Sequence, residues 1–170
     1  MGLREQLLAA SGRAGSSLAS LPREPARPWA VLACLDARMH VEDLLGFALG
    51  DAHVLRNAGA VVTDDVLRSL AISSHLLGTR EFAVIAHTTC GLLGLDEEAA
   101  RRTIDTHAAR PQRAPRLHAF SDLEGHVREQ VVRITTCPFL PTGAQVSGWI
   151  FDMPTGELRE IATGEVAATA

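Results

Sequence analysis

The chain contains two cysteines and a histidine that could bind one metal ion together, Cys34, His87 and Cys90. Cys34 opens a run that reads CLDAR (34–38), and His87 opens a run that reads HTTCG (87–91). Thiolate sulfur and imidazole nitrogen are ligands that suit Zn²⁺. A structural zinc site usually takes four protein ligands in two close pairs, whereas only His87 and Cys90 form a close pair here. Three strong ligands and an open fourth position indicate a catalytic site.

Each of these residues has a more ordinary interpretation when it is taken alone. Cysteine is often a small buried apolar residue, so Cys34 at the end of an apolar run could belong to the core. A lone His87 would more often be a hydrogen-bonded core imidazole. The combined pattern favours a metal site, because both segments follow apolar runs and continue with polar residues. Cys137 has no such context, and we expect a plain structural role for it.

Asp36 and Arg38 lie two residues apart near the first cysteine. In an extended turn their side chains can point the same way and meet as a bidentate ion pair. As an ordinary surface pair they would contribute little to stability. The functional interpretation places Asp36 beside the metal, held by Arg38, where it accepts a hydrogen bond from zinc-bound water. Such an acceptor matters because two thiolates cancel the formal charge of Zn²⁺ and weaken its pull on that water.

Strand and helix patterns alternate along the chain. Short apolar runs, helical periodicity and capping residues predict strands at 29–33, 52–55, 82–86, 146–151 and 158–161, and helices at 41–49, 63–78, 96–109 and 121–134. We expect Thr63 to cap the second helix, Gly50 to end the first, and Ser121 with Glu124 to form a capping box. The alternation predicts an α/β fold with a mostly parallel sheet, helices on both faces and an antiparallel edge.

This fold would place the candidate ligands together. The strands at 29–33 and 82–86 end at Cys34 and His87, and ligands in such sheets bind at the carboxyl ends of strands where the strand order reverses. Residues 1–28 are expected to form an N-terminal helical arm and a proline-bearing linker. Residues 29–170 are expected to form a single α/β domain that carries the zinc site.

Composition and charge argue against several other classes of protein. A chain of 170 residues suits one domain, and a net charge of −4 without a sustained basic stripe argues against a nucleic-acid partner. No apolar run approaches the roughly 20 residues that cross a bilayer, and the N-terminus lacks the apolar region of a signal peptide. We therefore expect no membrane partner and a cytoplasmic location, where three cysteines favour thiol or metal chemistry over disulfides.

Three ordered motifs resemble the β-carbonic anhydrase family: CLDAR at 34–38, RNAG at 56–59 and HTTCG at 87–91, with weaker similarity in GWIFD at 148–152. The resemblance implies that Cys34, His87 and Cys90 hold one Zn²⁺. It also implies that Asp36 and Arg38 are the catalytic, orienting pair. In some members the aspartate that matches Asp36 moves onto zinc, so Asp36 is also a conditional fourth ligand.

The activity that the resemblance implies is carbonate dehydratase: reversible hydration of CO₂ to bicarbonate and a proton by zinc-bound hydroxide. It further implies four parallel strands in the order 2-1-3-4 with an antiparallel fifth edge strand. The assembly would be a homodimer or a dimer of dimers with exchanged arms, in which Leu3, Leu7 and Leu8 pack on the partner. Val31 replaces the aromatic residue that accompanies Arg56 in members with a regulatory bicarbonate site, so we do not expect that site here.

Two alternatives to CO₂ hydration are open at this point. The first is a carbonyl sulfide or carbon disulfide hydrolase of the same fold, because zinc-bound hydroxide can attack any linear CX₂ carbon. Leu92 and Leu93, close to the ligands in sequence, would suit these more apolar substrates. The second is a non-catalytic structural zinc module, which would need Asp36 or Cys137 in the fourth position.

Overall fold

The computed structural model describes residues 2–12, 18–109 and 114–168. Part of the predicted arm and linker, residues 1 and 13–17, lies outside these ranges. The helices and strands are α1 (Leu3–Ala10), β1 (Trp29–Cys34), α3 (Val41–Leu45), β2 (Ala52–Asn57), α4 (Asp64–Leu77), β3 (Glu81–His87), α5 (Glu97–His107), α6 (Leu123–Thr135), β4 (Gln145–Phe151) and β5 (Leu158–Glu165).

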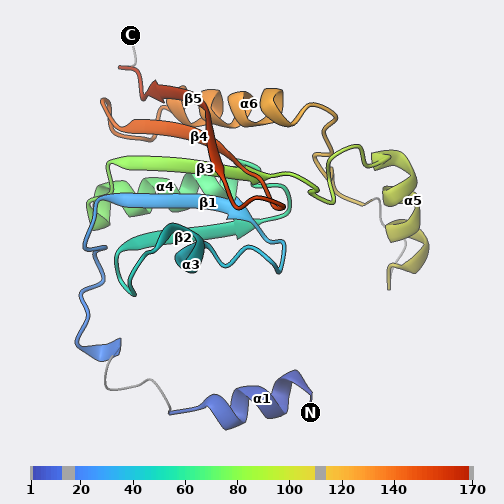
Figure 1. The fold of residues 1–170 in the computed structure, drawn as a ribbon, viewed down its shortest axis with the longest axis horizontal. Helices are drawn as coiled ribbons and strands as arrows, with labels where there is room; N and C mark the ends of the chain where they lie inside the picture. The colour runs from blue at the N-terminus through green and yellow to red at the C-terminus, as the bar shows by residue number, and fades with distance from the viewer. Residues whose placement is uncertain (1, 13–17, 110–113, 169–170) are drawn as a thin grey trace.

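The strands form a single five-stranded sheet in the order β2-β1-β3-β4-β5 (Figure 1). Strands β1 to β4 pair in parallel, and β5 pairs antiparallel with β4 at the edge. Strands β1 and β3 lie side by side in the middle and are buried along most of their length. Their continuous apolar sequences follow from this position, because a central parallel strand is covered on both faces. The predicted α/β fold class and strand order are confirmed.

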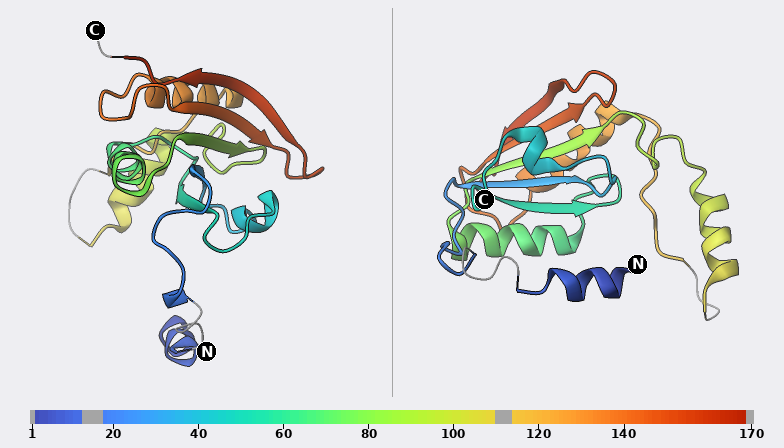
Figure 2. Two further views of the ribbon diagram at one scale, coloured as in Figure 1. Left: turned by 90° about the vertical axis from the view of Figure 1, so that its left-hand side faces the viewer. Right: turned by 60° about the horizontal axis from the view of Figure 1, so that its bottom comes forward.

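Helices cover both faces of the sheet, as predicted, but unequally (Figure 2). Helices α4 and α6 pack on one face, where Leu70 and Val131 join Leu32 and Val84 in the largest apolar cluster. The short helix α3 lies on the opposite face, where Val41 packs in a second cluster. Thr63 caps α4 as predicted, since its hydroxyl oxygen accepts a hydrogen bond from Val66 N at 3.4 Å.

Two predicted helix ends were wrong. Helix α3 ends at Leu45 rather than Leu49, because Gly46 already adopts a left-handed conformation (φ 66°) and acts as the cap instead of Gly50. Helix α6 is capped by Asp122 rather than Ser121, and the predicted capping box does not form. The carboxylate of Glu124 contacts Arg128 and Arg159 instead.

Helix α1 lies apart from the sheet and its covering helices (Figure 1). None of its residues is buried, and Leu3, Leu7 and Leu8 are 75%, 62% and 62% exposed. An apolar surface of this kind on a short helix is normally covered by another surface. Within the described ranges, no helix is both long and apolar enough to cross a bilayer.

Candidate metal centre

The candidate ligands meet at the carboxyl edge of the sheet. Cys34 is the last residue of β1 and His87 the last residue of β3, and these two strands are neighbours. From β1 the chain goes to β2 on one side, and it later returns to β3 on the other side. The two ligands therefore lie at the point where the strand order reverses, which is where α/β sheets bind ligands. Cys90 joins them from the turn that follows β3.

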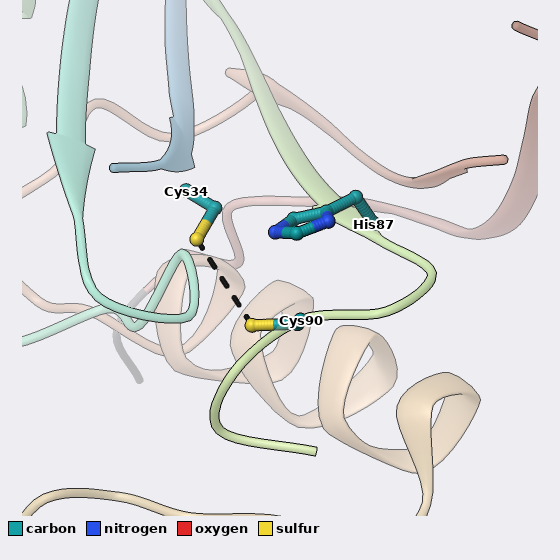
Figure 3. A group of neighbouring side chains, drawn as sticks. All are labelled: Cys34, His87 and Cys90. Carbon is teal, nitrogen blue, oxygen red and sulfur yellow. Dashed lines mark hydrogen bonds between the residues drawn. The ribbon is translucent and has the colours of Figure 1, made fainter. Parts of the chain in front are cut away.

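Cys34, His87 and Cys90 form a compact buried cluster (Figure 3). Their ligand atoms all lie within 4.8 Å of one another, and the two sulfur atoms are 4.0 Å apart. Among the described residues this is the one group of three or more such side chains that could hold a metal ion. Two thiolates and one imidazole favour Zn²⁺ among the common metals.

The imidazole of His87 is oriented for metal binding. Its Nδ1 lies 2.8 Å from the carbonyl oxygen of Thr88, so Nδ1 carries the proton and donates to that oxygen. The lone pair of Nε2 therefore points toward the sulfur atoms (Figure 3). Nε2 is buried and has no hydrogen-bond partner among the described residues. A buried polar atom left in this state destabilises the fold unless it binds something, and a metal ion meets that need.

The two thiols ionise at different pH because they are so close. The hydrogen bond from the Cys90 thiol lowers the pKa of Cys34, and the same hydrogen bond, together with burial, raises the pKa of Cys90. A second thiolate at this distance would repel the first. A divalent cation removes the conflict, since it stabilises both thiolates and displaces the remaining proton. The donor set therefore fits a zinc ion.

The Asp36 carboxylate lies beside the cluster and forms an ion pair with Arg38. Arg38 Nε donates to Oδ1 at 2.9 Å and Nη2 donates to Oδ2 at 2.7 Å, which is a bidentate pair. These bonds hold the pKa of Asp36 well below its usual range, so the group is ionised at neutral pH. Oδ2 lies 3.9 Å from His87 Nε2. Arg38 also reaches Thr89 Oγ1 at 3.4 Å, which links the segments after β1 and β3.

Arg56 braces the segment that carries Cys34 and Asp36, a role that the sequence did not reveal. Its Nε donates to the Cys34 carbonyl at 3.0 Å and its Nη2 to the Asp36 carbonyl at 2.7 Å. Leu35 N, between them, donates to the Asn57 carbonyl at 2.9 Å. The only sequence signal was the RNAG run itself, which does not say what its arginine contacts.

The turn after β3 is held by the segment after β4. Thr88 Oγ1 donates to Asp152 Oδ1 at 3.2 Å and accepts from Met153 N at 3.0 Å. The next residue, Thr89, has φ 59°, an uncommon conformation for a β-branched residue. Such strain persists only where the surroundings fix it. These contacts explain why the GWIFD segment, remote in sequence, belongs to the site.

An open cavity of about 320 Å³ lies over the cluster. Asp36 lines one side, and Leu35, Ala58, Gly59 and Leu92 supply the apolar remainder. A small uncharged molecule can enter here and meet both cysteine sulfur atoms and the carboxylate. Cys137 is not part of this site, because it packs in the largest apolar cluster with residues such as Phe82 and Ala144 near the opposite edge of the sheet.

The sequence from residue 29 to 158 matches the carbonic anhydrase family model. β-Carbonic anhydrase 1 of Mycobacterium tuberculosis is 44% identical over 142 residues, which cover 83% of this chain and 86% of that protein. A carbon disulfide hydrolase of an Acidianus species is 31% identical over 157 residues, covering 79% and 76% of the two chains. The chain therefore belongs to the β-carbonic anhydrase family.

Solved structures agree with this assignment. The crystal structure of carbonic anhydrase from Streptococcus mutans superposes with a TM-score of 0.84 at 38% sequence identity, covering 95% of this chain and 99% of that one. The resemblance inferred from three short motifs thus extends over nearly the whole chain.

We expect Arg56→Ala to lower zinc affinity by about 10- to 100-fold, which is typical when a residue that orients a metal ligand is removed. The variant leaves the carbonyls of Cys34 and Asp36 without their donor and frees the segment between them. Competition with a coloured chelator measures the change. Arg68→Ala is the control, because Arg68 pairs with Asp65 on the exposed side of α4. Equal affinities in the two variants would show that Arg56 does not brace the site.

Proposed function

We propose that this protein is a zinc-dependent carbonic anhydrase that interconverts CO₂ with bicarbonate and a proton. The observation that carries the proposal is the buried Nε2 of His87, which is aimed at two thiols and has no hydrogen-bond partner in the part of the chain that the structure describes. In it, Cys34, His87 and Cys90 hold Zn²⁺. When bound, the zinc ion acts as a Lewis acid and makes hydroxide available near neutral pH. Family membership supports the same reaction.

In the proposed reaction Asp36 orients the attacking water and does not act as a permanent ligand. Both carboxylate oxygens are held by Arg38, and Oδ2 faces the cluster, where it can accept a hydrogen bond from the water O–H. Rotation of Asp36 onto the metal would require these two bonds to Arg38 to break. We therefore propose that the fourth position is open in the active state, with Asp36 as a conditional ligand when the pair separates.

Asp36→Asn tests this assignment. The variant should fold, retain one zinc per chain by metal analysis, and lose about 10²-fold or more in kcat for CO₂ hydration, because a neutral amide accepts hydrogen bonds more weakly than a carboxylate and loses the ion pair with Arg38 that fixes its orientation. Asp65→Asn on the exposed face of α4 is the matched control and should behave like the wild type. Loss of zinc together with unfolding of the variant would instead favour the non-catalytic structural zinc module. Wild-type protein without stoichiometric zinc would refute both the zinc enzyme and the structural zinc module.

The second candidate activity is hydrolysis of carbon disulfide or carbonyl sulfide. The apolar lining of the cavity, with Leu35, Ala58 and Leu92, favours it, as does the relative named carbon disulfide hydrolase. CO₂ is our first choice because the more similar relative is a carbonic anhydrase. Turnover of all three substrates by one preparation decides between them. We expect kcat/KM to be highest for CO₂, and negligible CO₂ turnover beside rapid sulfide release would reverse the order.

We also propose a homodimer, or a dimer of such dimers, in the cytoplasm. The exposed leucines of α1 fit an arm that packs on a second copy, and reducing conditions would keep Cys34 and Cys90 available as ligands. Light scattering should give a dimer mass or a multiple of it for the wild type. Leu7→Glu should shift the mass toward the monomer, whereas Glu5→Gln on the same helix should not. A monomeric wild type would exclude this role of the arm.

A further inference from the structure

The turn between β2 and α4 has an unusual backbone. Gly59 and Ala60 are consecutive residues with positive φ, 80° and 54°, and Ala60 is completely buried. A left-handed conformation is unfavourable for any residue with a Cβ atom, so Ala60 must be held there by its surroundings. The Asn57 side chain supplies part of this support, since it bonds both the N–H and the carbonyl of Val61, at 2.8 and 2.7 Å.

This turn reaches the metal centre through Gly59. The pKa of the Cys34 thiol is lowered mainly by the Cys90 thiol and, to a smaller extent, by the backbone N–H groups of Asp36 and Gly59 that face its sulfur. Gly59 also lines the cavity over the cluster. The positive φ of 80° favours glycine at this position, and a Cβ atom here would also lie only 2.8 Å from Leu92 Cδ1. The orientation of Gly59 thus affects both the environment of the Cys34 sulfur and one wall of the cavity.

Helix α6 holds the turn from behind with two buried polar side chains. His126 Nε2 donates to the Gly59 carbonyl at 2.8 Å, and Gln130 Oε1 accepts from Val62 N at 2.8 Å. His126 is 5% exposed, and its ring stacks on Phe120 at a centroid distance of 4.0 Å. Burial lowers the pKa of His126, so the ring is neutral and its proton on Nε2 serves the Gly59 carbonyl. A polar pair inside an apolar helix interface needs such partners to be tolerated.

We propose that His126 is a positioning residue of the metal centre: by holding the Gly59 carbonyl at 2.8 Å, it fixes the Gly59 backbone where it lines the cavity beside Cys34 and turns its N–H toward the sulfur. The inference rests on the proposed function, because it takes Cys34 as a metal ligand. Hydrogen bonds to a ligating sulfur withdraw electron density from it and so increase the Lewis acidity of the metal. Residue 126 lies 67 positions from Gly59, on a helix that supplies no ligand.

His126→Phe removes the donor and keeps an aromatic ring that can stack on Phe120. In protein loaded with Co²⁺ in place of zinc, we expect the thiolate-to-cobalt absorption band to move to longer wavelength, because the Cys34 sulfur becomes richer in electrons. In zinc-loaded protein we expect kcat for CO₂ hydration to fall by about 10- to 100-fold. His126→Gln, whose amide can reach the Gly59 carbonyl, should restore most of both properties.

Ile134→Ala is the matched control, because Ile134 is a buried residue of α6 that contributes to the apolar core. It should lower the thermal midpoint without moving the cobalt band. If His126→Phe does not fold, His126→Asn replaces it, since its shorter amide falls short of the carbonyl.

The outcomes separate the two proposals. A wild-type protein that binds neither zinc nor cobalt overturns the proposed function. A wild type that binds metal and hydrates CO₂, alongside a His126→Phe variant whose band and kcat match those of Ile134→Ala, makes His126 an ordinary core residue and overturns this inference. Failure of His126→Gln to restore a shifted band would also overturn it, because the hydrogen bond would not be the cause.

Discussion

The molecule is organised around an electrostatic constraint: two sulfur atoms 4.0 Å apart are buried beside an imidazole nitrogen that has no hydrogen-bond partner within the described ranges. Both thiols cannot ionise there without a cation, and Nε2 of His87 cannot remain without a partner at no cost. A divalent metal satisfies all three groups at once. The rest of the site keeps them in place, since the Thr88 carbonyl sets the imidazole tautomer and backbone N–H groups face the sulfur atoms.

The parallel sheet meets this constraint with few residues. Pairing of β1 with β3 brings Cys34 and His87 to the same edge, so their proximity follows from strand register and does not depend on a flexible loop. Strand register does not orient the side chains that lie beyond the ends of the strands. That task falls to contacts between segments, in which Arg56 from β2 binds two carbonyls after β1 and Asp152 after β4 binds Thr88 after β3. Strand β2 thus braces the end of β1, and the segment after β4 braces the end of β3.

Local patterns in the sequence predicted the elements well, and tertiary contacts account for what they missed. Buried parallel strands have continuous apolar sequences, so β1 and β3 were evident, and the ligand types near their ends suggested the metal centre. The end of α3 was misplaced because two glycines, Gly46 and Gly50, offered equivalent caps and the first one took the role. No local pattern could pair His126 with Gly59 across 67 positions, since a lone histidine in a helix resembles any half-buried polar residue.

The fold alone does not distinguish carbon dioxide from carbon disulfide, because relatives named for each match similar shares of this chain. In the proposed chemistry both are linear molecules attacked at carbon, so the metal and its ligands would treat them alike. Carbon dioxide and carbon disulfide differ in size and polarity, and the wall of the cavity is the part of the site that would distinguish them. Asp36 forms its charged side, and Leu92, packed against Gly59, forms part of its apolar side. The turn that orients Gly59 therefore connects two properties, the environment of the Cys34 sulfur and the shape of the cavity.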